Sequence, residues 1–371
     1  MPVWQLPLHA GYHTTRNPPK AQYMKHYLLF VSHTYAYTIL RPIQRAIRQR
    51  GDEAAWFIES TSPDLLQVDE KRLRTLREVK AFAPIAVIAP GNWVYPFFPG
   101  VKVEVFHGYP MRKRIEAIDD HFTLRGWWDI YCTQGPSSTP YFSELSLKNG
   151  YFKIYETGWS KVDDFFPLQP DPERARPCIL YAPTFSKGIS SAWMMAPVIA
   201  HLAETKDWDW IITFHPKLDE PALLRQYQQL AAAHPNIDFR RINEGIRTFR
   251  ETDVLLCDSS SLIVEYLMTN KPAVTYRNTH PGPFLIDVQE AHEIGPAIEQ
   301  ALTHPESLMQ AINDYTAFHE AHRDGHNSER VLDAIDDFMA RYQGKLPRKP
   351  FYPIRQIKML YYYLRTRILS T

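Results

Sequence analysis

The stretch DVLLCDSSSLIVEYLMTNKPAVTY, residues 253–276, decides the fold that we expect for this chain. An apolar run at 253–258 has the length of a buried strand, and three serines then begin the helical pattern SLIVEYLMTN. A second apolar run follows at 272–276. A strand, a helix and a strand joined by short connections predict a parallel βαβ unit.

The same alternation of apolar runs and helical patterns extends in both directions. Strands are predicted in the first half of the chain at 27–32, 54–59, 84–90, 101–106, 128–133 and 151–156. In the second half they are predicted at 177–183, 208–214, 236–241, 253–258 and 272–276. Between the first two strands, one face of a predicted helix carries Ile39, Ile43, Ala46 and Ile47. This order predicts an α/β fold of doubly wound parallel sheets with helices on both faces.

The length and one proline-rich segment predict two domains and a tail. At ~150 residues per domain, a chain of 371 residues has room for two. The candidate linker is FFPLQPDPERARP, residues 165–177. We therefore expect Rossmann-like domains over residues 1–165 and 166–337, followed by a tail over 338–371. Parallel sheets bind ligands at the carboxyl ends of their strands, so the predicted site is a cleft between the domains.

The composition predicts a globular, cytoplasmic protein. Apolar residues make up 44% of the chain and charged residues 22%. No run approaches the roughly 20 apolar residues that cross a bilayer, and the first fifteen residues lack the pattern of a signal peptide. Cys132, Cys178 and Cys257 lie in or at the end of apolar runs without C-x-x-C spacing. They are predicted to be buried thiols, not a zinc site or disulfides.

The tail combines positive charge with aromatic residues. Residues 338–371 contain no acidic residue and eight basic ones, so the rest of the chain carries about −7 (+1 minus +8). Basic residues among Tyr, Phe, Leu and Ile suit a segment that lies on anionic lipid headgroups. A helix that packs its aromatic face on the core explains the pattern equally well. Nucleic acid is disfavoured as a partner because the body of the protein is acidic.

Several nucleotide-binding motifs are absent from the sequence. There is no G-x-G-x-x-G after the first strand, no G-x-x-x-x-G-K-[ST] and no G-x-S-x-G. Their absence argues against a dinucleotide oxidoreductase, a P-loop ATPase and an α/β-hydrolase. No carboxylate cluster requires a metal, and no cofactor is expected. We expect hydroxyls, a helix N-terminus and basic side chains to hold any phosphate.

Polar residues follow three predicted strands of the second domain. Asp258 ends one strand, and the serines after it offer hydroxyls and free N–H groups to a phosphate, although a serine-rich N-cap is a common structural feature. Four residues beyond the last serine, Glu265 faces either a ribose or solvent. His215 and Lys217 follow another strand, and Thr184, Ser186 and Lys187 a third. Each set fits either a pyrophosphate contact or an ordinary turn.

His107 occupies the corresponding position in the first domain. It follows the predicted strand at 101–106, and Arg112, Lys113 and Arg114 come shortly after it. A neutral imidazole with a pKa near 6.5 suits a general base that takes the proton of an attacking hydroxyl. A single histidine at a turn is more often structural. The basic residues after it suit an anionic acceptor or a lipid surface.

Five short stretches, in order, resemble motifs of the CDP-glycerol glycerophosphotransferase family, which includes teichoic-acid primases and polymerases. They are FHGYPMRKR (106–114), YAPTF (181–185), FHPK (214–217), CDSSSLIVEYLMTNKPAVTY (257–276) and RDGHNSERVLDAI (323–335). The resemblance implies a GT-B fold, with the active site between two Rossmann-like domains. It also implies transfer of a polyol phosphate from CDP-glycerol or CDP-ribitol to a hydroxyl of a glycan or glycolipid, with release of CMP.

The resemblance also implies roles for individual residues. The predicted catalytic residues are His107, as the base, and Asp258. The predicted donor phosphate ligands are His215, Lys217, Thr184, Lys187, Ser259, Ser260 and Ser261. The predicted contacts to the nucleotide or polyol are Gly108, Glu265, Lys271, Asp324, Ser328 and Arg330. Acceptor or membrane contacts are predicted for Arg112, Lys113 and Arg114.

Two departures from the family pattern and two rival functions remain. Ser186 and Lys187 follow Phe185, where the family usually has an arginine, and Ser259 stands where it often has a tyrosine. A GT-B glycosyltransferase or epimerase that uses a nucleotide sugar is one rival. A non-catalytic, polymer-binding protein of the same fold is the other. The favoured interpretation is an enzyme of cell-surface polysaccharide synthesis, held on the inner face of the cytoplasmic membrane by its tail.

Overall fold

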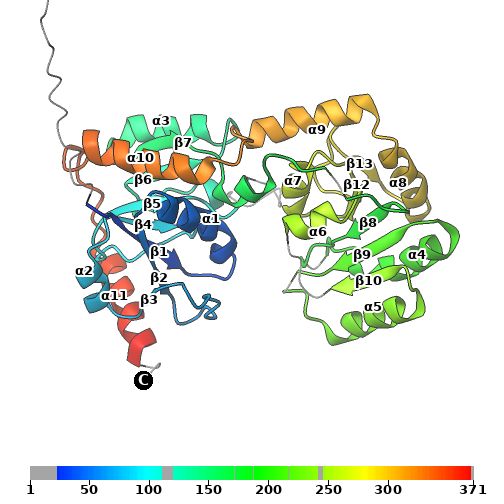
Figure 1. The fold of residues 1–371 in the computed structure, drawn as a ribbon, viewed down its shortest axis with the longest axis horizontal. Coiled ribbons are helices and arrows are strands. Elements are labelled where there is room, and N and C mark those ends of the chain that lie inside the picture. The colour runs from blue at the N-terminus through cyan, green and yellow to red at the C-terminus, as the bar shows by residue number, and fades with distance from the viewer. Residues whose placement is uncertain are drawn as a thin grey trace, which may run out of the picture.

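The computed structural model describes residues 23–110, 120–170, 172–186, 188–215, 217–240 and 245–368, which form two α/β domains (Figure 1). The first sheet has the order β3-β2-β1-β4-β5-β6-β7 and the second β10-β9-β8-β11-β12-β13. Every strand pair in both sheets is parallel. The predicted α/β class, with two doubly wound parallel sheets, is therefore confirmed.

The strands of both sheets coincide closely with the predicted apolar runs. The first sheet contains β1 (His26–Val31), β2 (Glu53–Ile58), β3 (Arg72–Leu73), β4 (Ala86–Ala89), β5 (Val101–Glu104), β6 (Ile130–Thr133) and β7 (Lys153–Glu156). The second contains β8 (Cys178–Tyr181), β9 (Asp209–Thr213), β10 (Ile237–Arg240), β11 (Val254–Cys257), β12 (Ala273–Tyr276) and β13 (Ile286–Val288). The edge strands β3 and β13 were not predicted, because two or three residues do not form a recognisable apolar run.

Helices cover both faces of each sheet. The first domain contains α1 (Ala36–Gln49), α2 (Leu76–Phe82) and α3 (Thr139–Asn149). The second contains α4 (Ala192–Thr205), α5 (Pro221–Ala233), α6 (Ile246–Arg250), α7 (Leu262–Leu267), α8 (Ile294–Leu302) and α9 (Glu306–His319). Central strands are buried on both faces, which explains their continuous apolar sequence. The three cysteines are buried thiols, as predicted.

The chain crosses between the domains twice. After α9, helix α10 (Asn327–Arg341) returns to the first domain and packs on α1 (Figure 1). Val331, Leu332 and Ile335 of α10 are fully buried, and Arg50 forms an ion pair with Asp333 at 2.7 Å. The predicted second domain ends at residue 337, but the structure places residues 327–337 with the first sheet. The apolar face of α10 needs a partner, and α1 supplies it.

The basic tail forms helix α11 (Pro353–Ile368), which lies beside α2 (Figure 1). Tyr363 is 8% exposed, packs on the rings of Tyr95 and Phe97, and accepts a 2.6 Å hydrogen bond from the backbone N–H of Leu76. The tail therefore docks on the core. Its outer face nevertheless exposes Ile354, Ile357, Leu360, Tyr361 and Leu364. Within the described residues, no helix is long and apolar enough to span a membrane.

Gly158 lies at the first crossing and has no space for a side chain. Its φ is +75°, and a Cβ there would lie 2.3 Å from Glu320 Oε1 and 2.4 Å from Asn327 Oδ1. Gly51 has almost the same φ, +76°, but no atom within 4 Å of that position. A comparison of substitutions at the two glycines therefore separates the cost of backbone strain from the cost of steric overlap.

We expect Gly158→Ala to destabilise the protein more than Gly51→Ala does. The left-handed backbone costs both variants about 1–2 kcal/mol, and overpacking adds a further ~1–3 kcal/mol only at position 158. Urea unfolding of the two variants measures this difference. Equal losses of stability would show that the contact between Gly158 and Glu320 does not constrain the crossing.

Candidate active site

His107 stands at the carboxyl edge of the first sheet, as predicted. The two residues between β5 and His107 are buried, whereas the histidine itself is exposed. Phe106 adopts a φ of +52°, stacks on His121 at 4.5 Å, and accepts a hydrogen bond at its carbonyl from Trp159 Nε1–H. This anchored turn projects the His107 ring outward, where it stacks on Tyr35 at 5.3 Å. The exposed imidazole is accessible to a substrate.

Asp258 is completely buried at the end of β11. Its Oδ1 accepts a hydrogen bond from the Thr184 backbone N–H at 2.8 Å. Its Oδ2 accepts hydrogen bonds from the N–H and the hydroxyl of Ser191 at 2.9 and 3.0 Å. Burial raises the pKa of this carboxyl group, although these hydrogen bonds oppose the shift. Because both oxygens are used and no surface is exposed, the structure is at odds with the predicted catalytic role; Asp258 positions the loop after β8.

The serines after Asp258 have different surroundings. Ser259 is buried, and its hydroxyl accepts a hydrogen bond from Thr279 N–H at 2.9 Å. Ser260 and Ser261 are partly exposed at the beginning of α7, which has only six residues. Ser259 therefore holds the loop after β12 in place. Ser260 and Ser261 keep surface for a ligand.

The loops after β8 and β9 meet at an aromatic cluster. The ring of Phe185 lies 4.4 Å from the ring of His215, and the ammonium group of Lys217 lies 5.2 Å from the same phenyl ring. His215 Nδ1 accepts a 3.1 Å hydrogen bond from Lys217 N–H. In a neutral ring the proton then lies on Nε2, which becomes a donor. The predicted phosphate ligands His215 and Lys217 are thus neighbours, and both are exposed.

A pocket of about 190 Å³ lies between the two domains. Pro110, three residues after His107, lines it from the first domain, and His319 lines it at the second crossing. Its other wall belongs to the second domain: Ile263, Asn278, His280, Phe284, Leu285 and Tyr315. The side-chain amide of Asn278 also donates to the Asp258 carbonyl at 2.7 Å. Pro110 after β5 and Asn278 after β12 therefore line the same interdomain cavity, and Asn278 connects it to the turn after β11.

Two residues predicted to contact the CDP-activated donor, Glu265 and Lys271, bind other groups of the protein. Glu265 accepts a 2.6 Å hydrogen bond from Lys161 Nζ, which precedes the linker. Lys271 is buried, and its ammonium group donates to the carbonyl oxygens of Phe249 and Thr252 at 2.9 and 2.6 Å. Glu265 thus joins the linker region to α7, and Lys271 holds the end of α6. The backbone carbonyl of Gly108 accepts a hydrogen bond from Gln134 Nε2 at 2.7 Å.

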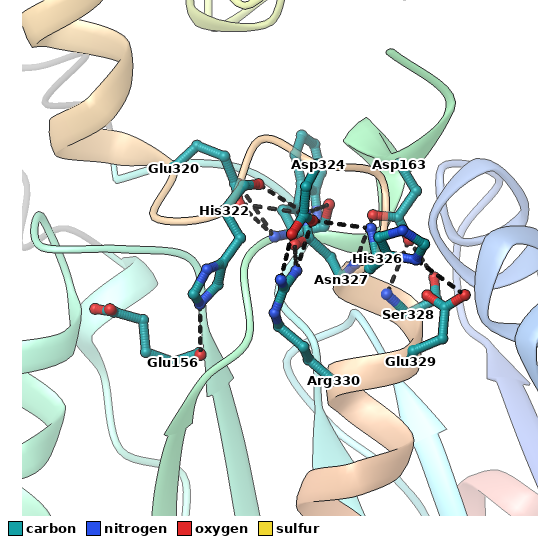
Figure 2. Close-up of polar contacts among 11 residues, drawn as sticks. Glu156, Asp163, Glu320, His322, Asp324, His326, Asn327, Ser328, Glu329 and Arg330 are labelled. Atoms are coloured by element: carbon teal, nitrogen blue, oxygen red, sulfur yellow. Dashed lines mark hydrogen bonds and ion pairs between the residues drawn. The ribbon is translucent and has the colours of Figure 1, made fainter. Parts of the chain in front are cut away.

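The stretch 323–335 forms a structural junction (Figure 2). Arg330 Nη1 donates to Asp324 Oδ1 at 2.8 Å, and this pairing holds the pKa of Asp324 well below its usual range. Ser328 is buried, and its hydroxyl donates to Asp163 Oδ2 at 2.6 Å. These three residues were predicted to bind the nucleotide or polyol. The structure shows them holding the start of α10 against the first domain.

The sequence did not reveal Glu320, which lies at the centre of this junction. The residue is 1% exposed, and its carboxyl group accepts hydrogen bonds from the Tyr109 hydroxyl at 2.7 Å, Trp159 N–H at 3.1 Å and Asn327 Nδ2 at 3.2 Å. Burial raises the pKa of Glu320 to about 8, and burial raises that of Asp163 to about 6. A single glutamate between two helices carries no sequence signal, because Tyr109 and Trp159 are 211 and 161 residues away and Asn327 begins another helix.

Of the remaining predicted site residues, the structure describes Thr184. Thr184 is buried, and its N–H is bonded to Asp258. Lys187, Arg112, Lys113 and Arg114 lie outside the described residues. In the part of the chain that the structure describes, no group of three His, Cys, Asp or Glu residues is arranged to hold a metal ion.

Residues 156–337 match the family CDP-Glycerol:Poly(glycerophosphate) glycerophosphotransferase. The matched region contains four of the five stretches on which the predicted resemblance depends, from YAPTF to RDGHNSERVLDAI. The stretch around His107 precedes it. No curated protein sequence matches the chain.

Solved structures with a similar fold cover most of this chain. The S. aureus MnaA structure with UDP has a TM-score of 0.59 and 15% identity, and covers 88% of this chain and 100% of its own. The wall teichoic acid polymerase TagF has a TM-score of 0.59 and 13% identity, with coverages of 86% and 90%. UDP-GlcNAc 2-epimerase from Neisseria meningitidis bound to UDP-GlcNAc has a TM-score of 0.56 and 14% identity, with coverages of 85% and 100%. These likenesses confirm the GT-B fold.

The buried Glu320 carboxyl predicts a pH dependence of stability. Its pKa is raised from 4.5 to about 8, so between these values the native protein holds a proton that the unfolded chain has lost. The free energy of unfolding therefore falls as the pH rises through this window, by up to about 1.4 kcal/mol per pH unit. We expect Glu320→Gln, which stays neutral, to flatten this slope in urea unfolding between pH 5 and pH 8.

The exposed Glu144 on α3 provides the control for this experiment. Glu144→Gln should keep the slope of the unchanged protein, because the side chain has the same chemistry but is in water. If Glu320→Gln also kept that slope, the carboxyl group would not be protonated in the folded protein.

Proposed function

We propose that this protein transfers glycerol phosphate, or a similar polyol phosphate, from a CDP-activated donor to a hydroxyl of a glycan or glycolipid acceptor and releases CMP. The family match over residues 156–337 carries the proposal. The exposed His215 and Lys217 and the partly exposed Ser260 and Ser261 support it, because they lie at the carboxyl edge of the second sheet, where parallel sheets bind ligands. TagF has been solved with CDPG, which is consistent with such a donor.

In the proposed reaction, the acceptor oxygen attacks the phosphorus atom that bears the polyol. A new P–O bond forms, the P–O bond to the CMP group breaks, and CMP leaves with the electron pair. The acceptor hydroxyl gives its proton to the His107 ring. An exposed imidazole at an anchored turn suits this role, since it is held in place by the Tyr35 ring and remains accessible.

The donor side supplies hydrogen bonds and positive charge. With its proton on Nε2, His215 donates to a pyrophosphate oxygen, and Lys217 adds a cation beside it. Phosphoryl transfer depends mainly on such positioning and charge neutralisation. Asp258 acts through other residues: it fixes the loop that carries Phe185, against which His215 and Lys217 pack.

We further propose that α11 rests on an anionic membrane surface. Ile354 and Ile357 are 81% and 68% exposed, and basic residues lie on the same helix. Exposed aliphatic side chains beside cations suit the boundary between headgroups and acyl chains. This orientation brings the first domain close to a membrane-bound acceptor.

We expect His107→Asn to lower the rate of CMP release from CDP-glycerol, in the presence of acceptor, by about 100-fold or more. CDP-glycerol affinity, measured by calorimetry, should change by less than about twofold, because the histidine acts on the acceptor. His292→Asn is the matched control, since His292 is exposed and distant in sequence from every predicted site residue. If His107→Asn transferred as fast as the unchanged protein, His107 would not be the base.

We expect Ile354→Ser/Ile357→Ser to reduce the fraction of protein that floats with phosphatidylglycerol vesicles by about half or more. Val68→Ser/Leu147→Ser is the control, because it also removes two exposed aliphatic side chains. If both variants floated like the unchanged protein, α11 would not be a membrane contact.

A further inference from the structure

A pocket of about 590 Å³ lies between the carboxyl edge of the first sheet and helix α11. None of the catalytic, donor or acceptor residues predicted one by one from the sequence lines it, although residues of the predicted basic tail do. Its walls contain three aromatic side chains and three cations: Trp93, Trp127, Tyr362, Arg125, Arg355 and Lys358. Its volume is within the range of about 300–1,000 Å³ typical of small-molecule sites.

The charge of this pocket favours an anionic ligand. Glu59 is the acidic residue among the lining side chains, is 3% exposed, and accepts a 2.8 Å hydrogen bond from the Tyr95 hydroxyl. Among the described residues, neither Arg355 nor Lys358 forms an ion pair with a carboxylate, and both side chains are exposed. Arg355 Nη1 donates to the Arg125 carbonyl at 3.0 Å, and both cations pack on tyrosine rings, so a ligand phosphate would meet these two cations without breaking an ion pair.

The aromatic rings of the pocket indicate a second property of the ligand. Trp93 packs edge-on against Phe30 and Tyr95, so its position is fixed by the core. Trp127 is 8% exposed. Flat aromatic surfaces beside amide and hydroxyl groups suit a ring that has both apolar C–H faces and hydroxyls. A sugar ring has this character, and a purely lipidic group does not.

The pocket lies on the same edge of the sheet as His107. Asn92 and Trp93 follow β4, which pairs with β5 in parallel, and His107 follows β5. Gly91, the neighbour of Asn92, approaches Ser32 and Tyr35, since a Cβ there would lie 2.6 Å from Ser32 Oγ and 3.8 Å from Tyr35 Oη. Tyr35 in turn stacks on His107. Adjacent loops therefore connect the pocket to the proposed base.

We infer that this pocket binds a phosphorylated sugar, and that it is the subsite that holds the acceptor for transfer at His107. The second part rests on the proposed function. The cations of α11 bind the sugar phosphate and the tryptophans face the ring, while the exposed apolar face of α11 keeps the site close to a membrane. The tail thus completes the acceptor site from the far end of the chain.

Binding of soluble probes to the full-length protein tests this inference. Tryptophan fluorescence and calorimetry would measure affinity for glucose 1-phosphate, N-acetylglucosamine 1-phosphate, glucose and inorganic phosphate. We expect saturable binding of at least one sugar phosphate, about tenfold or more tighter than glucose or phosphate alone. Arg355→Gln/Lys358→Gln should weaken that binding about tenfold or more, since it removes two cations that form charge-assisted hydrogen bonds with the phosphate.

The matched control is Arg77→Gln/Lys80→Gln, which removes the same two charges from exposed positions on α2, outside the pocket. It should bind the sugar phosphate within about twofold of the unchanged protein. An equal loss in both variants would overturn the inference, because it would indicate long-range electrostatics. So would the absence of saturable binding, equally tight binding of inorganic phosphate, or binding only to phosphatidylglycerol vesicles.

CDP-glycerol affinity, measured on the same protein, separates this inference from the proposed function. If the protein bound the sugar phosphate but not CDP-glycerol, the pocket would be a sugar-phosphate site and the proposed glycerophosphotransferase activity would be wrong. If it bound CDP-glycerol but no sugar phosphate, the proposed function would be kept and the inference about the pocket would be wrong.

Discussion

The buried carboxyl group of Glu320 joins three segments that are distant in the sequence. It accepts hydrogen bonds from Tyr109, which follows the strand of His107, from Trp159 at the first crossing, and from Asn327 at the second. Gly158 is a glycine because any side chain there would overlap this carboxyl group. These segments belong to both crossings of the chain. The relative position of the two sheet edges therefore depends on the contacts of Glu320. The interdomain pocket beside His319 follows from that position.

A second buried carboxylate, Asp258, performs a similar task within the second domain. It holds the loop after β8 and the start of α4 at the end of β11, and the turn that contains it is also bound to the loop after β12. Glu320 and Asp258 are thus both buried, and both position loops. His107, His215 and Lys217 remain accessible, and each of them packs against an aromatic ring.

The predicted fold was accurate because it depends on local patterns. Continuous apolar runs such as 27–32 and 253–258 coincide with strands β1 and β11, and the helix predicted around Ile39–Ile47 is α1. The candidate site was only partly predictable. Asp258, Glu265, Lys271, Asp324 and Arg330 have the residue types of ligand contacts, yet each is occupied by a protein partner. Their occupation depends on residues in other elements, and no spacing in the sequence reveals it.

By itself the sequence determined the two parallel sheets, the strand ends that carry polar residues and the family resemblance. These properties follow from hydrophobic periodicity and from short motifs, both of which are local. Tertiary structure alone decided that α10 belongs with the first domain, that Glu320 lies at the junction, and that α11 closes a pocket lined by Trp93 and Trp127. Each of these depends on contacts between residues far apart in the chain, where the burial of an apolar face selects the partner.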